Sequence, residues 1–207
     1  MPSPNAPHVA YDIPESSQEV VYEIKKSRFI AVGAHITTKQ GAKDFLNTSK
    51  QRYPDARHHC WAYQFGPPNM PHSAAMSDDG EPSGTAGKPI LNVLKHKDIG
   101  DIMIVVTRYF GGIKLGASGL VRAYSHAAQL AIDNLTLKQQ VPMLSIAITC
   151  DFSQEQTVRH WLSSIHNKNL QAQYLQQVVI TTDLAFDQWQ SLHKKCQSLG
   201  IEVEHDS

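Results

Sequence analysis

The stretch Ile102–Phe110 constrains the fold more than any other part of the sequence, because it is apolar at nearly every position. A strand with one face in water alternates apolar and polar side chains, whereas a strand covered on both faces reads as a continuous apolar run. We therefore predict a buried strand here, followed by a glycine-rich turn at Gly111–Gly116. The longest predicted helix comes next, with an apolar stripe formed by Leu120, Tyr124, Ala127, Ala131 and Leu135.

The segments before this strand predict short strands that alternate with helices. Residues 19–36 are typical of two strands with a turn at Lys25–Arg28, and apolar residues at helical spacing predict a helix that ends near Gln51. Two strands and a second helix are expected after it, and Thr85 can cap that helix if Pro89 lies in its first turn. Their expected ranges are Arg57–Phe65, His72–Met76 and Thr85–His96.

The sequence changes character at Lys138–Pro142, which we interpret as a linker. Beyond it, the apolar spacing predicts the order βαββαβ, which is typical of a ferredoxin-like domain. Ser153 and Gln156 are expected to form a capping box at the start of its first helix, and Gly200 to end its second helix. We accordingly expect an α+β protein in three parts: a loose tail at 1–17 in which 9–13 could pack locally, a domain at 18–138, and the ferredoxin-like domain at 143–207.

The charge balance excludes two classes of protein. Lys and Arg number 19 and Asp and Glu number 19, so the chain is neither uniformly basic, as a nucleic-acid coat protein is, nor strongly acidic and solvated. The neutral total hides an asymmetry, because residues 1–140 carry 15 basic and 12 acidic side chains whereas residues 141–207 carry 4 and 7. The more basic part also contains the glycine-rich segments.

Cysteine usage and hydropathy indicate a cytoplasmic protein. The three cysteines are odd in number and far apart, which excludes a fully paired disulfide framework and fits a reducing compartment. No CxxC pair is present, which argues against a thiolate zinc site. No stretch has the apolar length of a signal peptide or a membrane span, so we expect no membrane association.

The most unusual segment is Ser77–Pro89, where three carboxylates precede a Ser-Gly-Thr-Ala-Gly-Lys turn that opens a helix. Free N–H groups at a helix start, next to glycines and a lysine, can bind an anion. A Walker-type ATPase is excluded, because Pro82 replaces the first P-loop glycine and Pro89 replaces the residue whose hydroxyl holds magnesium. The alternative is a structural one, in which the glycines serve the turn and the acidic loop faces the helix start; its carboxylates are Asp78, Asp79 and Glu81.

A second candidate is the strand exit, Val105–Gly119. Arg108 lies near the end of an apolar strand, so its charge needs a partner or a place at the mouth of the strand. The glycine spacing does not match a dinucleotide-binding fingerprint. In the structural interpretation Arg108 pairs with one of the two neighbouring aspartates of the acidic loop, Asp78 or Asp79. In the functional one, Tyr109 and Phe110 stack on nucleic-acid bases.

The third candidate is Arg57-His-His-Cys60. Side chains alternate along a strand, so His58 and Cys60 face one side and His59 faces the other. Only two of the three could then share a metal ion, and zinc requires three or four ligands. The sequence therefore predicts no metal site, no cofactor and no assigned catalytic residue.

These segments, in this order, resemble the IMPACT/YigZ family over residues 18–135. The matching stretches are Glu23–Phe29, Ala56–Cys60, Ser77–Pro89 and Val105–Gly116. The resemblance implies a bacterial two-domain member: an N-terminal α/β sandwich like the second domain of a small-subunit ribosomal protein, then a ferredoxin-like domain. Both folds recur in translation elongation factor G. The resemblance also implies a link to translation, since eukaryotic members regulate it in the response to amino-acid starvation.

The leading hypothesis is a non-enzymatic, translation-associated regulator that binds RNA or the ribosome through glycine-rich helix starts. Its expected binding residues are Arg57, His58, Ser83, Gly84, Thr85, Gly87, Lys88, Arg108, Tyr109, Gly111, Gly112, Lys114 and Arg122. Two alternatives stay open. One is a hydrolase or phosphoryl-group enzyme that uses His58, Asp78, Asp79 and Lys88. The other is a protein-interaction module whose acidic C-terminal domain docks a basic partner.

Overall fold

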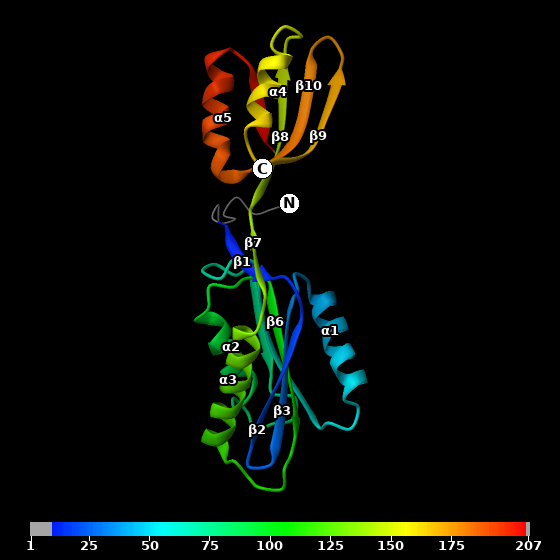
Figure 1. Ribbon diagram of the computed structural model, residues 1–207, viewed down its shortest axis with the longest axis vertical. Helices are drawn as coiled ribbons and strands as arrows, with labels where there is room; N and C mark the ends of the chain where they lie inside the picture. Colours follow the sequence, from blue (N-terminus) through cyan, green and yellow to red (C-terminus); the bar gives the residue numbers. More distant parts are fainter. Residues whose placement is uncertain (1–9, 206–207) are drawn as a thin grey trace. The chain divides into compact units, whose positions relative to one another are not determined.

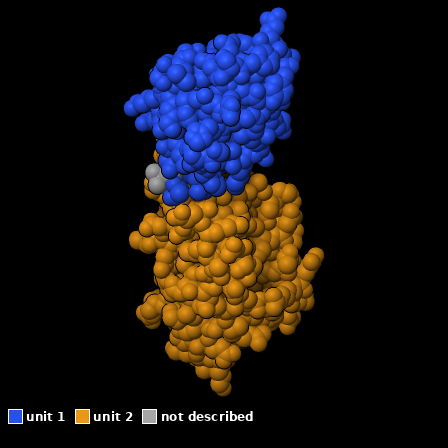
Figure 2. Space-filling model, turned by 45° about the horizontal axis from the view of Figure 1, so that its top comes forward, with its two compact units in different colours: residues 1–10, 141–207 blue, residues 11–140 orange. Residues whose placement is uncertain are grey.

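The computed structural model describes residues 10–205 and divides them into two compact units (Figure 2). One comprises residues 11–140, and the other comprises residue 10 with residues 141–205. The described residues form an α+β protein with five helices and three antiparallel sheets. None of the helices in this part of the chain is long and apolar enough to cross a membrane.

The N-terminal unit is built on a five-stranded antiparallel sheet with the strand order β2-β3-β6-β4-β5. These strands span Gln18–Ile24 (β2), Ser27–His35 (β3), His58–Phe65 (β4), Ser73–Ser77 (β5) and Ile102–Tyr109 (β6). The predicted buried strand is confirmed as β6, the middle strand of the sheet, and every residue from Ile102 to Arg108 is buried.

Helices cover both faces of this sheet (Figure 1), which explains the continuous apolar run of β6. Helix α2 (Gly87–Lys95) and helix α3 (Ala117–Asp133) lie on one face, and helix α1 (Lys39–Arg52) lies on the other. Ile104 and Val106 belong to the core under α2 and α3, whereas Met103 and Val105 belong to a second core that includes Ala42 of α1. Residues 102–106 of β6 therefore all need apolar side chains.

Two short strands close the N-terminal unit where the sequence predicted a loose tail and a linker. Strand β1 (Tyr11–Pro14) pairs antiparallel with strand β7 (Leu137–Gln140). Tyr11 Oη also donates a hydrogen bond to Asp101 Oδ2 at 2.7 Å, and the amide of Gly100 donates to Asp12 O. The predicted linker was therefore wrong at residues 138–140, and the loose tail was wrong at residues 11–14, although local packing had been allowed for residues 9–13. Strands so short and so far apart in sequence leave no local periodicity. Residues 1–9 of the expected tail lie outside the described residues.

Two predicted helix caps are also wrong. Thr85 does not cap α2; its hydroxyl donates to Pro82 O at 2.6 Å, and α2 begins two residues later. In the C-terminal unit, helix α4 (Glu155–Ser163) begins at Glu155 and has no side-chain cap. Gln154 accepts a hydrogen bond from the amide of Asp151, so the capping box expected at Ser153 does not form. In both cases the preceding turn places a different residue at the helix start.

The C-terminal unit has the predicted element order βαββαβ. Its remaining elements are strands β8 (Met143–Cys150), β9 (Asn167–Tyr174), β10 (Val178–Ala185) and β11 (Glu202–His205) and helix α5 (Phe186–Ser198). The strands pair in the order β11-β8-β10-β9. Helices and sheet share a core that includes Ile148, Val158, Ile180 and Leu192.

Candidate nucleic-acid interface

Three chain segments meet at one end of the N-terminal unit, where β6 ends and β4 begins. The register of the sheet places Arg108 between Phe29 of β3 and His58 of β4. The amide of Gly111 donates to Ser27 Oγ at 3.1 Å, so the loop after β6 packs on the turn between β2 and β3. A Cβ atom at position 111 would lie only 1.9 Å from the carbonyl carbon of Lys26, which requires glycine there.

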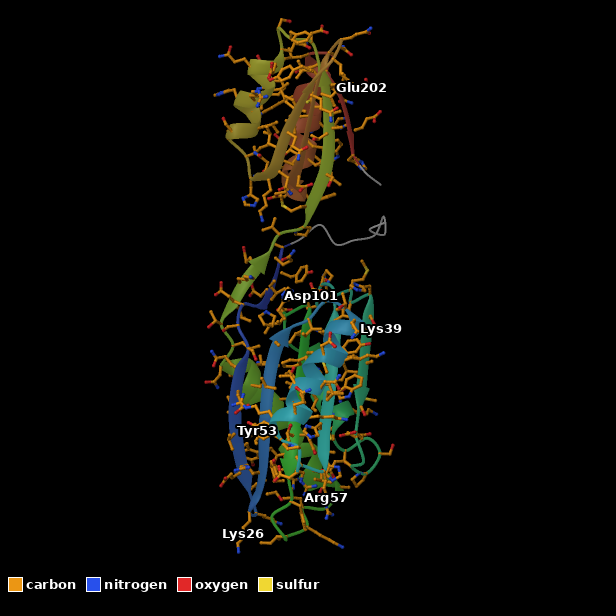
Figure 3. The ribbon with its side chains drawn as sticks, turned by 90° about the vertical axis from the view of Figure 1, so that its right-hand side faces the viewer. Lys26, Lys39, Tyr53, Arg57, Asp101 and Glu202 are labelled. Atoms are coloured by element: carbon orange, nitrogen blue, oxygen red, sulfur yellow. The ribbon has the colours of Figure 1, made fainter. Side chains whose placement is uncertain are left out.

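We call this region the basic end and define it as residues 25–28, 57–58 and 108–118. Figure 3 shows Lys26 and Arg57 at this same end of the unit. The cationic side chains of the basic end that are exposed are Lys25, Lys26, Arg28, Arg57 and Lys114.

The start of helix α2 is occupied by the protein's own carboxylate. Asp78 accepts hydrogen bonds from the amides of Gly84 (2.8 Å), Ala86 (2.9 Å) and Gly87 (2.8 Å). Burial acts to raise the pKa of Asp78, but the three backbone donors outweigh it and hold the pKa below its usual value. Within the predicted Ser83–Lys88 anion site, the amides of Gly84, Ala86 and Gly87 are therefore already paired with Asp78, and the amide of Thr85 donates to Pro82 O, although the Lys88 side chain is exposed. The structural interpretation of the acidic loop placed all three carboxylates at this helix start, and it holds for Asp78 alone, since Asp79 accepts from the His59 amide and Glu81 pairs with Arg108.

Arg108 pairs with the third carboxylate of that loop and with neither aspartate. Its Nη1 lies 2.6 Å from Glu81 Oε1, and the two side chains are 7% and 3% exposed. Tyr124 of α3 donates its hydroxyl hydrogen to the same Glu81 oxygen at 2.9 Å, and the thiol of Cys60 lies 3.3 Å from Tyr124 Oη. Burial raises the pKa of Cys60 to about 12, so the thiol stays protonated at neutral pH. The chain Arg108–Glu81–Tyr124–Cys60 ties the acidic loop to β6, α3 and β4.

The predicted alternation along β4 is confirmed by the contacts of His58, His59 and Cys60. His59 is buried on the α1 face beside Thr107 (3.1 Å) and Ser49 (3.4 Å), where burial lowers its pKa. Cys60 belongs to the core on the opposite face, together with Tyr124 of α3.

The residues of the enzyme hypothesis do not converge on an open cavity. Asp79 Oδ2 accepts from the His59 amide at 2.7 Å, while His58 Nδ1 lies 2.9 Å from the carbonyl oxygen of Asp79. Asp78 holds the α2 amides, as described above. Within residues 10–205, no group of three His, Cys, Asp or Glu side chains lies close enough to hold a metal ion.

The start of helix α3 differs from that of α2 because it stays open. Its N-cap is Gly116, which supplies no side-chain hydrogen bond. In the described part of the chain the amides of Ala117, Ser118 and Gly119 have no partner, since the first hydrogen bond of the helix runs from Leu120 to Gly116. Lys114 before the helix and Arg122 within it are both exposed. An anion at this helix start meets free N–H groups and positive side chains.

A cavity of about 280 Å³ lies next to this loop, lined by Asp55, Arg57, His58, Arg108, Tyr109 and Phe110. Tyr109 donates to Asp55 Oδ1 at 2.8 Å, and the Arg28 guanidinium lies 4.7 Å from the centre of the Tyr109 ring.

Sequence reasoning missed Asp55 and Tyr124. Asp55 follows Pro54 with no motif around it, and Tyr124 was assigned to an apolar stripe; the only available signal was that a buried tyrosine needs a hydrogen-bond partner.

Comparisons with known proteins agree with this arrangement of segments. The Impact N-terminal domain matches residues 25–132. The chain is 41% identical over 162 residues to "IMPACT family member YigZ" of Escherichia coli (strain K12), covering 78% of this chain and 79% of that protein. It is 37% identical to "IMPACT family member YvyE" of Bacillus subtilis (strain 168), covering 81% and 73%. A solved structure described as that of a hypothetical protein aligns with a TM-score of 0.71 and 34% identity, over 96% of this chain and 98% of that one. The chain therefore belongs to the IMPACT family.

Proposed function

We propose that this protein is a translation-associated regulator that binds RNA or the ribosome through the basic end of its N-terminal unit. The observation that carries the proposal is the open start of α3, where the amides of residues 117–119 are unpaired among the described residues and exposed Lys114 and Arg122 flank them in the sequence. Phosphate groups bind at such sites, because N–H groups and the helix dipole both favour negative charge.

The fold adds support at a coarser level. We interpret the N-terminal unit as the α/β sandwich of a ribosomal-protein second domain and the C-terminal unit as ferredoxin-like, both of which recur in translation elongation factor G. The strand order β11-β8-β10-β9 and the element order of the C-terminal unit agree with that interpretation. A fold by itself does not imply a function, so the specific support for RNA or ribosome binding is the open start of α3.

The test is filter binding of single-stranded RNA to the full-length protein over a series of salt concentrations. Each phosphate contact on a single strand contributes about −0.7 to the slope of log K against log salt concentration. The double variant Lys114→Gln/Arg122→Gln should therefore reduce the magnitude of the slope by about 1.4. Lys194→Gln is the matched control, because Lys194 is exposed and lies in the other unit. Binding that is undetectable or independent of salt, with no comigration with ribosomes, refutes the proposal.

A second candidate is a protein-docking role for the C-terminal unit. It is favoured by a hollow of about 340 Å³ on its sheet, lined by polar residues that include Ser145, Gln171, Thr181, Asp183 and Glu204. Two carboxylates in this hollow suit a basic partner. In a pull-down from ribosomal extract, Glu204→Lys should lose a partner that wild type and Lys114→Gln both retain. Equal capture by all three proteins refutes this role.

A further inference from the structure

The cavity at the basic end contains a guanidinium group that the protein pairs only in part. Arg108 lines the cavity and is 7% exposed. Its Nη1 donates to Glu81, but its Nε is buried and has no hydrogen-bond partner among the described residues. A buried N–H of a charged group that lacks a partner is rare and costly in native proteins. Arg108 therefore brings to the cavity wall a positive charge whose donors the described residues do not all use.

The other lining residues supply positive charge and one aromatic face. Arg57 is exposed and forms no hydrogen bond or ion pair with the described residues. His58 Nδ1 lies 2.9 Å from the carbonyl oxygen of Asp79. Because a carbonyl oxygen can only accept, Nδ1 carries a proton, and Nε2 is the ring nitrogen left for a ligand. Asp55 is the only carboxylate of the lining, and Tyr109 already donates to it.

Phe110 provides the aromatic face. Its side chain is 55% exposed, and its ring centre lies 5.5 Å from the guanidinium carbon of Arg108. Exposed aromatic rings beside arginines are the elements on which proteins stack nucleic-acid bases. A simple inorganic anion makes no use of such a ring.

We infer that this cavity binds one phosphorylated nucleotide, with the phosphate against Arg57 and Arg108 and the base on the ring of Phe110. A volume of about 280 Å³ is close to the lower end of small-molecule sites, which fits a single nucleotide unit. The nucleotide can belong to RNA, in which case the inference rests on the proposed function and adds a specific contact to it. It can also be a free mononucleotide, and the experiment separates the two sources.

The experiment measures binding of adenosine monophosphate, adenosine and inorganic phosphate to the full-length protein by calorimetry. We expect adenosine monophosphate to bind at least about tenfold more tightly than either fragment, because only the nucleotide engages both parts of the site. Phe110→Ala should weaken nucleotide binding at least about fivefold and leave phosphate binding unchanged. Arg57→Gln should weaken both. Phe152→Ala is the matched control, since Phe152 is 56% exposed and lies in the other unit.

A second readout follows Arg108 without replacing it, since a variant at this buried pair could fail to fold. In protein labelled with ¹⁵N-arginine, the Nε–H signal of Arg108 should shift on addition of adenosine monophosphate and remain unshifted with adenosine. Equal affinity for phosphate and nucleotide, together with no effect of Phe110→Ala, refutes the inference and leaves a simple anion site. An Arg108 Nε–H signal that never responds also refutes it.

Competition with RNA distinguishes the failure of this inference from that of the proposed function. RNA that binds with the expected salt dependence, but is not displaced by adenosine monophosphate and is unaffected by Phe110→Ala, refutes the cavity site and supports the proposed function. Adenosine monophosphate that binds with the expected variant effects, while RNA does not bind, supports the site with a free nucleotide as its ligand and refutes the proposed function.

Discussion

Asp78 is predicted to hold the start of helix α2 by itself, so its replacement tests the account of the acidic loop. The carboxylate accepts three backbone hydrogen bonds of 2.8–2.9 Å: Oδ1 serves Ala86 and Gly87, and Oδ2 serves Gly84. Asp78→Asn keeps one oxygen for the first two amides but turns an NH₂ group toward the third. It also removes the negative charge from the positive end of the helix.

The magnitude follows from these losses. Replacing a side chain that caps a helix start costs about 0.5–2 kcal/mol, and a charge at a helix terminus contributes about 0.3–1 kcal/mol. We expect Asp78→Asn to reduce the free energy of unfolding of the N-terminal unit by about 1.5 kcal/mol, and Asp78→Ala to reduce it by about 2–3 kcal/mol. With a urea dependence of about 2 kcal/mol per molar, the asparagine variant should unfold at a concentration about 0.7 M lower.

The assay is urea unfolding of the full-length protein followed by tryptophan fluorescence. Trp61 is the only tryptophan of the N-terminal unit, so a background with Trp161→Phe and Trp189→Phe reports on that unit alone. The control is Asp98→Asn, because Asp98 is exposed and forms no hydrogen bond or ion pair with the described residues. An unfolding midpoint for Asp78→Asn equal to that of the control refutes the capping role.

The pH dependence gives an independent check with a definite sign. The pKa of Asp78 is lower in the folded protein than its usual value, so the carboxylate stabilises the fold above the unfolded pKa of about 3.9. That stabilisation is lost as the pH falls through the folded pKa. The stability difference between wild type and Asp78→Asn should therefore be constant from about pH 5 to 8 and shrink below about pH 4. A difference that stays constant in acid contradicts a role for the charge.

Three further predictions concern a buried ion pair, a closely packed glycine and the buried cysteines. Glu81→Ala leaves Arg108 buried and unpaired, so it should reduce the free energy of unfolding by about 3–5 kcal/mol in the same assay. Glu81→Leu combined with Arg108→Met should recover most of that loss. A reduction below about 1 kcal/mol for Glu81→Ala contradicts the buried pair. Gly111→Ala places a methyl group against the backbone of Lys26. It should destabilise the N-terminal unit more than Gly112→Ala, where the methyl group meets open space at a φ of +83° and the cost should be about 1–2 kcal/mol. The reverse order contradicts the close packing of the loop on the β2–β3 turn. Burial raises the pKa of Cys60 to about 12, and the other two thiols are also buried. Ellman's reagent at pH 8 should therefore label none of the three cysteines rapidly in the native protein, and all three in urea. Rapid labelling of a native thiol contradicts its burial.

Local sequence patterns were sufficient for the elements that bury side chains in a regular way. Strand β6 was predictable because both of its faces are covered, so each of the five consecutive residues 102–106 is apolar. The order βαββαβ of the C-terminal unit was predictable for a similar reason, since each strand and helix there buries one periodic face. Strands β1 and β7 were not predictable, because their stability comes from pairing with each other and not from periodicity.

The sequence alone determined that an arginine, an acidic loop and two glycine-rich helix starts belong to one domain. The tertiary structure decided which of these groups can still bind an external ligand. Asp78, Asp79 and Glu81 lie within four residues, and positive φ angles at Asp79 and Gly80 turn the loop so that Glu81 reaches Arg108 while Asp78 reaches the amides of α2. The amides of Gly84, Ala86 and Gly87 at the start of α2 are thereby taken by Asp78, whereas the start of α3 remains open. The physical reason is that hydrogen bonds and ion pairs act over about 3 Å, so the path of the loop in space, and not its composition, selects the partner of each charge.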